Sequence, residues 1–310
     1  MTGADAVACA RDAFERSSHA LRLESDRDIG SLTTYRVGGA ADLFVTCEES
    51  DDLDEVARVV ALSGIDVVVI GNGSNLLVSD RGFRGIAIVL GGTFEFIGLI
   101  GNELRVGGAT RLPVAARRSA AAGLAGFEWA VGVPGTIGGA VRMNAGGHGS
   151  DIARTLVSVD IVDLRHATHT TRPANQLDLR YRHSNLTPCD VVVEARFALA
   201  RGDSIRSENE IAEIVRWRRE NQPGGQNAGS VFTNPPGDSA GRLIDAAGCK
   251  GLRIGSAHVS SKHANFFIAD DGGSADDVFA LMREVRRRVR DAHRVELTAE
   301  TQLVGFEEGL

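Results

Sequence analysis

The spacing of apolar residues predicts helices along much of the chain. The clearest helix covers residues 275–293, where one face carries a stripe of apolar side chains: Val278, Leu281, Met282, Val285 and Val289. Residues 51–64 begin with acidic residues and end at a glycine, which is typical of a helix with favourable termini. Further helices are expected over residues 112–122, 208–220 and 239–247, and over most of residues 1–30.

Short runs of aliphatic residues predict strands between these helices. Residues 65–70 form an apolar run typical of a buried strand, and they lead directly into a glycine-rich segment. Other strands are expected over residues 86–90, 103–106, 157–162, 191–198 and 295–304. Residues 126–149 have little periodicity, and a loop of that length inside a domain is usually functional. The mixture indicates an α+β protein, whose last α/β unit starts after a boundary near residues 200–207.

Glycine content adds to this picture, because the chain of 310 residues has 37 glycines against a usual share of about 7%. The glycines gather in a few loops and show no short repeat, which excludes a collagen-like chain. Clustered glycines indicate tight turns and backbone that lies close to a ligand. The net charge of −7 lacks the basic surplus of a typical nucleic-acid-binding protein, so we expect no nucleic-acid partner.

Cysteine and histidine positions give no sign of a metal site. The cysteines do not pair at metal or redox spacing, so we interpret all of them as free thiols in a reducing compartment: Cys9, Cys47, Cys189 and Cys249. His166 and His169 lack cysteine or glutamate partners in their segment and fit a surface location. No apolar run approaches the ~20 residues of a membrane span, and the N-terminus has no secretory pattern. We therefore expect a cytoplasmic protein with no metal and no membrane partner.

Two glycine-rich segments are candidates for binding a nucleotide. Residues 71–75 follow a predicted strand, but the crossover after them is too short for a Rossmann helix, and the chain has no P-loop sequence. Their backbone N–H groups could form a concave site for a pyrophosphate, and a plain glycine turn fits the segment equally well. The second segment, residues 132–147, holds six glycines, and its alternative interpretation is a tightly packed turn. Two such segments favour a dinucleotide lying between two subdomains.

Six motifs, taken together, resemble one enzyme family. They are Tyr-Arg-Val-Gly-Gly-Ala at 35–40, Gly-Asn-Gly-Ser-Asn-Leu-Leu at 71–77, Val-Pro-Gly-Thr-Ile-Gly-Gly at 133–139, Tyr-Arg-His-Ser at 181–184, Ala-Gly-Ser-Val-Phe-Thr-Asn-Pro at 228–235 and Lys-His-Ala-Asn-Phe at 262–266. In this order, over nearly the whole chain, they resemble UDP-N-acetylenolpyruvoylglucosamine reductase, also called UDP-N-acetylmuramate dehydrogenase. The last third has no added tyrosine-bearing loop, which resembles the shorter subgroup of the family.

The resemblance implies a fold and a reaction. The expected fold is a two-subdomain FAD-binding fold of the vanillyl-alcohol oxidase type over residues 1–200, with subdomains of about 20–88 and 89–200. An α/β substrate-binding domain follows at 205–310. The implied enzyme holds FAD non-covalently, takes hydride from NADPH and reduces the enolpyruvyl ether of UDP-N-acetylglucosamine enolpyruvate to UDP-N-acetylmuramate. This nucleotide-sugar reaction is a step in peptidoglycan precursor synthesis.

The resemblance also implies which residues bind the cofactor. They lie on the two glycine-rich segments: Gly71, Asn72, Gly73, Ser74, Asn75, Leu76, Gly132, Val133, Pro134, Gly135, Thr136, Gly138, Gly139, Asn144, Ala145 and Gly146.

Three residues have the chemistry that the implied reaction needs. Arg182 can hold the substrate carboxylate in a bidentate fork, because its guanidinium stays charged when buried. Ser230 can protonate the substrate carbon if its hydroxyl lies within hydrogen-bond reach. Glu300, on the predicted final strand, is expected to be protonated with a raised pKa, because an ionised carboxylate would repel the developing charge. Without the resemblance, the same residues fit a surface arginine, a turn serine and an exposed strand face.

Further residues are implied as substrate contacts, and some positions depart from the family pattern. Asn234, Lys262 and Asn265 are the implied contacts, with Lys262 suited to a diphosphate; a surface lysine is the alternative. The family usually has alanine and tyrosine where this chain has Gly147 and His148. Lysines common in the family appear here as Thr233 and Asn221.

Two other functions compete with this hypothesis. One is an FAD-linked oxidase or dehydrogenase of the same fold. Many such oxidases tether the flavin through a histidine or cysteine near the first glycine turn, and residues 37–40 contain neither. The other is a non-catalytic nucleotide-sugar binder, which would need no flavin and no set of Arg182, Ser230 and Glu300.

Overall fold

The computed structural model describes residues 3–307 and 309–310, which divide into two compact units. Unit 1 consists of Met1–Ser25, Leu43–Asn72 and Arg84–Arg218, and unit 2 consists of Asp26–Asp42, Gly73–Phe83 and Arg219–Leu310. Each unit has apolar core residues of its own. The units therefore interleave in sequence, and the predicted domains at 1–200 and 205–310 stay predictions.

Unit 1 contains most of the strands. Its five-stranded antiparallel sheet has the order β12 (Thr168–Pro173), β11 (Leu156–Asp163), β13 (Asp190–Ala198), β7 (Glu103–Gly107) and β6 (Ile97–Ile100). A second sheet, to which this unit contributes most residues, has the order β1 (Leu23–Asp28), β2 (Ala40–Cys47), β5 (Phe83–Leu90) and β3 (Val67–Val69). Short pairs are β8 (Leu124–Ala125) with β14 (Ala200–Arg201), and β9 (Gly146–Gly147) with β10 (Ser150–Asp151).

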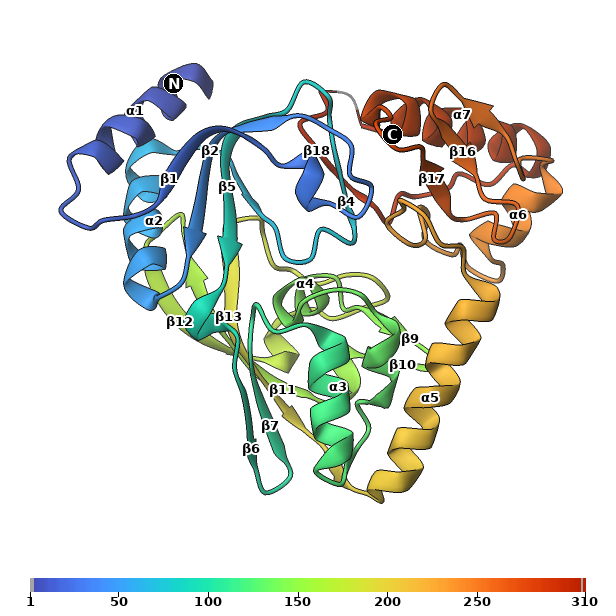
Figure 1. The fold of residues 1–310 in the computed structure, drawn as a ribbon, viewed down its shortest axis with the longest axis horizontal. Helices are drawn as coiled ribbons and strands as arrows, with labels where there is room; N and C mark the ends of the chain where they lie inside the picture. Colours follow the sequence, from blue (N-terminus) through green and yellow to red (C-terminus); the bar gives the residue numbers. More distant parts are fainter. Residues whose placement is uncertain (1–2, 308) are drawn as a thin grey trace. The chain divides into compact units, whose positions relative to one another are not determined.

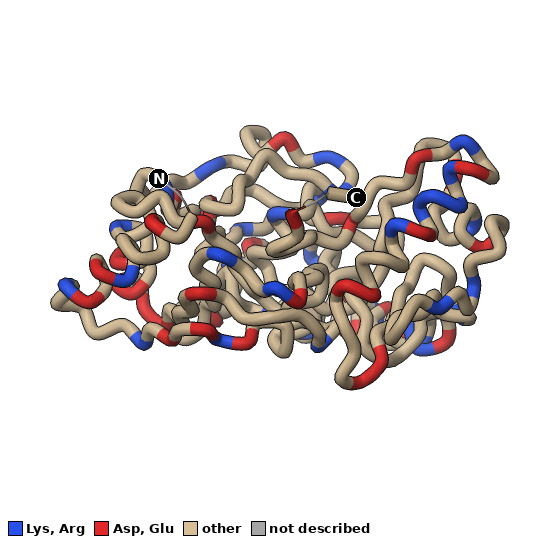
Figure 2. The backbone as a smooth tube through the Cα atoms, turned by 90° about the horizontal axis from the view of Figure 1, so that it is seen from above, with Lys and Arg blue, Asp and Glu red and all other residues tan. Residues whose placement is uncertain are grey.

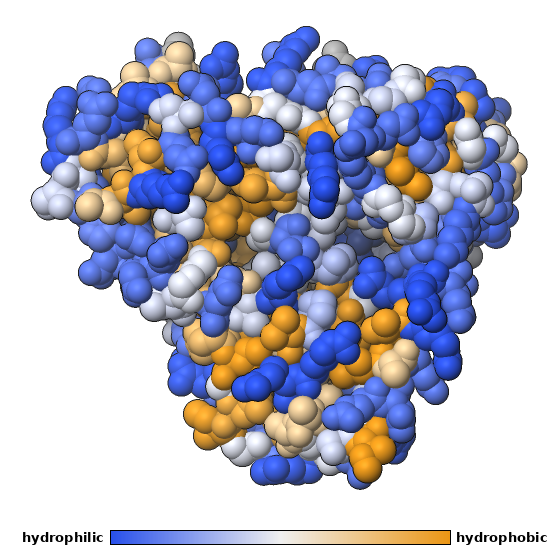
Figure 3. All heavy atoms as spheres, viewed as in Figure 1, coloured by the Kyte–Doolittle hydropathy of each residue, from blue (hydrophilic) through white to orange (hydrophobic). Residues whose placement is uncertain are grey.

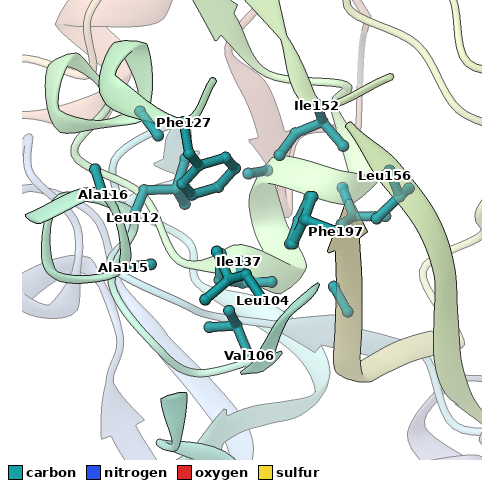
Figure 4. Packing of buried hydrophobic residues seen from close by; sticks show 14 of the residues in the cluster. Leu104, Val106, Leu112, Ala115, Ala116, Phe127, Ile137, Ile152, Leu156 and Phe197 are labelled. Atoms are coloured by element: carbon teal, nitrogen blue, oxygen red, sulfur yellow. The ribbon is translucent and has the colours of Figure 1, made fainter. Parts of the chain in front are cut away.

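Helices cover these sheets and supply much of the core (Figure 1). They are α1 (Gly3–Glu15), α2 (Ser50–Ser63), α3 (Leu112–Ala121), α4 (Ile137–Arg142) and most of α5 (Ser204–Asn221). Helix α2 begins with a capping box at Glu49 and ends at Gly64, whose φ of 63° is left-handed, as the sequence predicted. In the larger core, the rings of Phe127 and Phe197 lie 4.9 Å apart beside Leu104 and Ile137 (Figure 4).

Unit 2 combines two helices with short strands. These are α6 (Ala240–Ala246), α7 (Ala275–His293) and a sheet of β15 (Arg253–Ile254), β16 (Ala257–Val259) and β17 (Phe267–Ala269). Strand β4 (Leu76–Val78) pairs in parallel with β18 (Gln302–Val304), so the end of the chain lies beside residues that follow the first glycine-rich segment. The predicted apolar stripe of α7 is buried in this core. Asp80 accepts hydrogen bonds from Ser274 Oγ and from the N–H groups of Ala275 and Asp276, at the N-terminus of α7.

Most predicted elements are confirmed, and three predictions need correction. Residues 295–304 contain only the short strand β18, because residues 295–301 find no continuous partner strand; Ala299 makes an isolated bridge to Phe232. Residues 126–149 are not an open loop, since they include a 3-10 helix at Glu128–Gly132 and helix α4. The N-terminal helix ends at Glu15, and residues Leu23–Asp28 form β1.

Charged residues of both signs are interspersed along the backbone (Figure 2). Hydrophilic side chains cover much of the face shown in Figure 3, with apolar patches among them. Among the described residues, no helix is long and apolar enough to span a membrane.

Candidate active site

The two predicted glycine-rich segments meet within unit 1. The side-chain amide of Asn72 donates a hydrogen bond to the carbonyl of Pro134, 62 positions later in the chain. A side chain at Gly71 would force Thr136 to shift, because its Cβ would lie 2.4 Å from Oγ1 of Thr136. The two segments therefore lie side by side at Asn72 and Gly71.

The first segment presents unused backbone donors. In the part of the chain that the structure describes, the N–H groups of residues 71–75 donate no backbone hydrogen bond. Gly73 has a φ of +60°, and a Cβ there would lie 2.2 Å from the carbonyl oxygen of Leu32. Glycine is thus required at 73 by the fold itself. Successive unpaired N–H groups are suited to phosphate oxygens, so this segment fits the diphosphate of a dinucleotide such as FAD.

In the second segment, several backbone N–H groups donate hydrogen bonds to other protein groups. The N–H groups of Ile137 and Gly138 donate to the carbonyls of Thr110 and Gly108, at 2.9 and 2.8 Å. The N–H of Gly139 donates to Thr136 Oγ1, which caps helix α4. This arrangement favours the packed-turn interpretation for Gly138 and Gly139.

The other predicted cofactor residues lie beside these groups. Val133 and Ala145 donate backbone hydrogen bonds to Ala130 and Ala140, Gly135 accepts one from Leu112, and Leu76 begins β4. Contacts of either segment with a cofactor, those of Ser74 and Gly132 included, stay predictions.

Arg182 lies in a strained turn of unit 1. Its φ is +54°, a left-handed conformation that costs free energy for any residue other than glycine. Its Nη2 donates a 2.9 Å hydrogen bond to the carbonyl of Gly146, and its guanidinium lies 5.2 Å from the ring centroid of Tyr181. Non-glycine residues in this conformation often belong to functional sites. The turn thus holds the guanidinium at the end of the second glycine-rich segment.

Ser230 and Glu300 are joined through one residue of unit 2. The N–H of Glu300 donates a 2.8 Å hydrogen bond to the carbonyl of Val231, which directly follows Ser230. Phe232 and Ala299 form a bridge beside this bond, so residues 230–232 and 299–300 run antiparallel. Ser230 and Glu300 are both half-buried. The Ser230 hydroxyl has no hydrogen-bond partner among the described residues and remains available as a donor. The structure therefore brings together two of the predicted catalytic residues, though not on the long strand that the sequence predicted for Glu300.

Three asparagines that the sequence assigned to ligands bond the protein backbone with their side chains. Asn144 donates to the carbonyl of Arg180, two residues before Arg182. Asn265 bonds both the N–H and the carbonyl of Phe232, two residues after Ser230. Asn75 donates to the carbonyl of Glu300. Each asparagine side chain thus fixes backbone at or near a predicted catalytic residue, which sequence spacing did not indicate.

Asn234 and Lys262 also have partners within unit 2. Oδ1 of Asn234 accepts from the N–H of Ala240, at the first turn of α6. Nζ of Lys262, an exposed residue, donates a 2.8 Å hydrogen bond to the carbonyl of Arg219 near the C-terminal end of α5. Their roles in substrate binding stay predictions.

His263 is a residue that the sequence did not single out. Its Nδ1 accepts a hydrogen bond from the N–H of Asn265, and its ring lies against Phe266 with centroids 4.8 Å apart. Burial lowers the pKa of this imidazole. The only available signal was its place in the Lys-His-Ala-Asn-Phe motif.

His148, at a position that departs from the family pattern, lies beside the second glycine-rich segment. Its ring packs edge-on against Trp217, and a Cβ at Gly132 would lie 3.1 Å from its Cδ2. Among the described residues, no group of histidine, cysteine and acidic side chains could hold a metal ion.

Known protein families and relatives match most of the chain. Residues 221–304 match the family model described as UDP-N-acetylenolpyruvoylglucosamine reductase, C-terminal domain, and residues 41–171 match the model of an FAD binding domain. The UDP-N-acetylenolpyruvoylglucosamine reductase of Heliobacterium modesticaldum is 43% identical over 88% of this chain and 88% of its own length. The chain belongs to the UDP-N-acetylenolpyruvoylglucosamine reductase family.

Other relatives of the reductase family agree in length and fold. The reductase of Rubrobacter xylanophilus is 40% identical over 90% of this chain and 94% of its own. The crystal structure of the reductase from Thermus caldophilus superposes with a TM-score of 0.80 at 35% identity, covering 92% of this chain and all of that one. A Physcomitrella patens BBE-like protein shares only the fold, with a TM-score of 0.57 at 13% identity. The predicted family and the predicted FAD-binding fold with a C-terminal reductase domain are thus confirmed.

Proposed function

We propose that this protein reduces the enolpyruvyl ether of UDP-N-acetylglucosamine enolpyruvate to UDP-N-acetylmuramate, with NADPH as the reductant. The observation that carries the proposal is the joining of Ser230 and Glu300 through Val231, in a chain that is 43% identical to a reductase of this name. Such a reaction supplies a peptidoglycan precursor. The cytoplasm is the proposed compartment, because nucleotide sugars and NADPH are found there; the four free cysteines support it.

FAD would be held by the unpaired N–H groups of residues 71–75, and when bound it supplies hydride transfer between NADPH and the substrate. Residues 132–146 would complete its site. The absence of histidine and cysteine from residues 37–40 supports non-covalent binding.

Arg182 would hold the substrate carboxylate. Charge develops next to that carboxylate when the double bond is reduced, and a fixed guanidinium stabilises the resulting dianion. The hydrogen bond from Arg182 to the Gly146 carbonyl and the strained turn restrict the side chain in advance, so less conformational entropy is lost on binding.

Glu300 and Ser230 would act on the reacting carbons from neighbouring backbone segments. A protonated Glu300 donates a hydrogen bond to the developing negative charge, whereas an ionised one would repel it. Ser230 donates its hydroxyl proton to the carbanion carbon, and solvent returns a proton to the serine oxygen. Asn234 and Lys262 are the proposed contacts to the nucleotide part, together with backbone held by Asn265.

The test is a steady-state assay of the purified protein. Beyond the single equivalent that reduces bound FAD, NADPH should be consumed only when the enolpyruvyl nucleotide sugar is present, and mass spectrometry should find the saturated lactyl ether. Consumption of NADPH that is indifferent to this substrate, with no lactyl ether formed, would overturn the proposal.

A further inference from the structure

Asn75 bonds the backbone on both sides of Thr301. Its side-chain Nδ2 donates a 3.0 Å hydrogen bond to the carbonyl of Glu300, 225 positions later in the chain. Its own carbonyl accepts a 2.9 Å hydrogen bond from the N–H of Gln302. These two bonds extend the parallel pairing of β4 and β18 by one step, and both partners lie in unit 2. Asn75 therefore holds residues 300–302 through two hydrogen bonds.

The remaining contacts of the Glu300 backbone show why this bond matters. The N–H of Glu300 is held by Val231, next to Ser230. Its carbonyl is held by Asn75 at 3.0 Å and more weakly by Nε2 of Gln302 at 3.3 Å. Residues 295–301 belong to no strand, and the Val231 carbonyl that holds Glu300 also accepts a longer bond, of 3.3 Å, from the N–H of Thr301. Loss of the Asn75 amide would remove the shorter of these two hydrogen bonds to the Glu300 carbonyl.

We propose that Asn75 is a positioning residue for Glu300, and that its side chain acts on catalysis through the Glu300 backbone. The inference rests on the proposed role of Glu300. Asn75 would then have two separate roles. Its backbone N–H remains available to a ligand, and its side-chain amide bonds the Glu300 carbonyl. A displacement of about 1 Å at a catalytic group can cost on the order of 10²-fold in rate.

The test is a double-mutant cycle with Asn75→Ala, Glu300→Ala and the combined variant, each saturated with FAD. The measured quantity is the rate at which the enolpyruvyl substrate restores flavin absorbance after anaerobic reduction. Asn75→Ala should slow this step by about 10- to 100-fold in the wild-type background and by about twofold or less in the Glu300→Ala background. Asn75→Asp, which keeps the volume but replaces the donor by an acceptor, should be at least as slow. The dissociation constant for FAD should change by less than about threefold in Asn75→Ala, since the backbone donors remain.

Gln302→Ala is the matched control, because it removes the longer hydrogen bond to the same carbonyl and leaves Asn75 in place. It should retain nearly the wild-type rate. If Asn75→Ala slowed flavin reoxidation equally in the wild-type and Glu300→Ala backgrounds, the inference would be overturned. It would also be overturned if Asn75→Ala weakened FAD binding and left the reoxidation rate unchanged. A wild-type rate in Glu300→Ala would contradict the proposed role of Glu300 itself, which distinguishes that failure from a failure of the inference alone.

Discussion

The N–H of Glu300 donates to the carbonyl of Val231 at 2.8 Å, so the position of Glu300 is tied to the residue that follows Ser230. Backbone bonding thus couples the segment of the proposed neutral acid to that of the proposed proton donor. Since Asn265 also holds Phe232 from the other direction, the three-residue stretch 230–232 is fixed on two sides. The predictions below follow from this local arrangement and from the strained turn at Arg182.

Glu300→Gln should retain more activity than Glu300→Ala. An amide can still donate a hydrogen bond to the developing charge, as the proposed neutral acid does, whereas alanine cannot. Loss of one such donor costs on the order of 10²–10³-fold in the chemical step. The rate of substrate reduction under anaerobic conditions distinguishes the two variants. Equal losses in both would argue against a neutral, hydrogen-bond-donating Glu300.

Arg182→Lys should impair substrate reduction although it keeps the positive charge. A lysine cannot present the planar fork that binds a carboxylate through two hydrogen bonds, and we expect a loss of about 10- to 100-fold in kcat/KM. Arg180→Ala, in the same turn, is the control, because its carbonyl still accepts from Asn144 and its side chain bonds only exposed groups. Similar losses in Arg182→Lys and Arg180→Ala would mean that the turn, and not the guanidinium fork, is what matters.

Arg182→Gly should inactivate the enzyme with little loss of stability. Glycine adopts the φ of +54° without strain, which offsets the lost hydrogen bond to Gly146. We expect the free energy of unfolding to change by less than about 1 kcal/mol in urea denaturation. A loss of several kcal/mol would show that the side chain mainly stabilises the fold.

The sequence predicted the elements whose pattern is local. The stripe of α7 and the termini of α2 are properties of nearby residues, so their bounds are close to those observed. The long final strand was wrong because strand length depends on a partner edge, and residues 295–301 have only an isolated bridge. The asparagine roles were missed for a related reason. Asn75 and Glu300 are 225 positions apart, and nothing in either motif specifies that contact.

His263 should make stability depend on pH. Burial lowers its folded-state pKa below the usual value of about 6.5, and its Nδ1 must be unprotonated to accept from Asn265. The unfolded chain therefore binds protons first as the pH falls. The contribution of the neutral ring is complete above about pH 6.5 and decreases as the pH drops through the folded pKa.

His263→Asn provides the comparison, because an amide oxygen can accept the same hydrogen bond without titrating. Between pH 7.5 and 5, the wild type should lose more stability than this variant in urea unfolding. Parallel losses in the two proteins over this range would show that His263 does not titrate as described.

The most direct test of the mechanism separates the two half-reactions in Ser230→Ala. Reduction of bound FAD by NADPH needs no proton on the substrate carbon, so stopped-flow absorbance should show bleaching at nearly the wild-type rate. Return of the colour on adding the enolpyruvyl substrate needs that proton, and removal of a positioned acid typically costs about 10²–10⁴-fold. Ser230→Cys should lie between, because a thiol can donate but is larger. A Ser230→Ala enzyme that is slow in its reduction by NADPH and normal in its reoxidation by substrate would contradict the assignment of Ser230 as the proton donor.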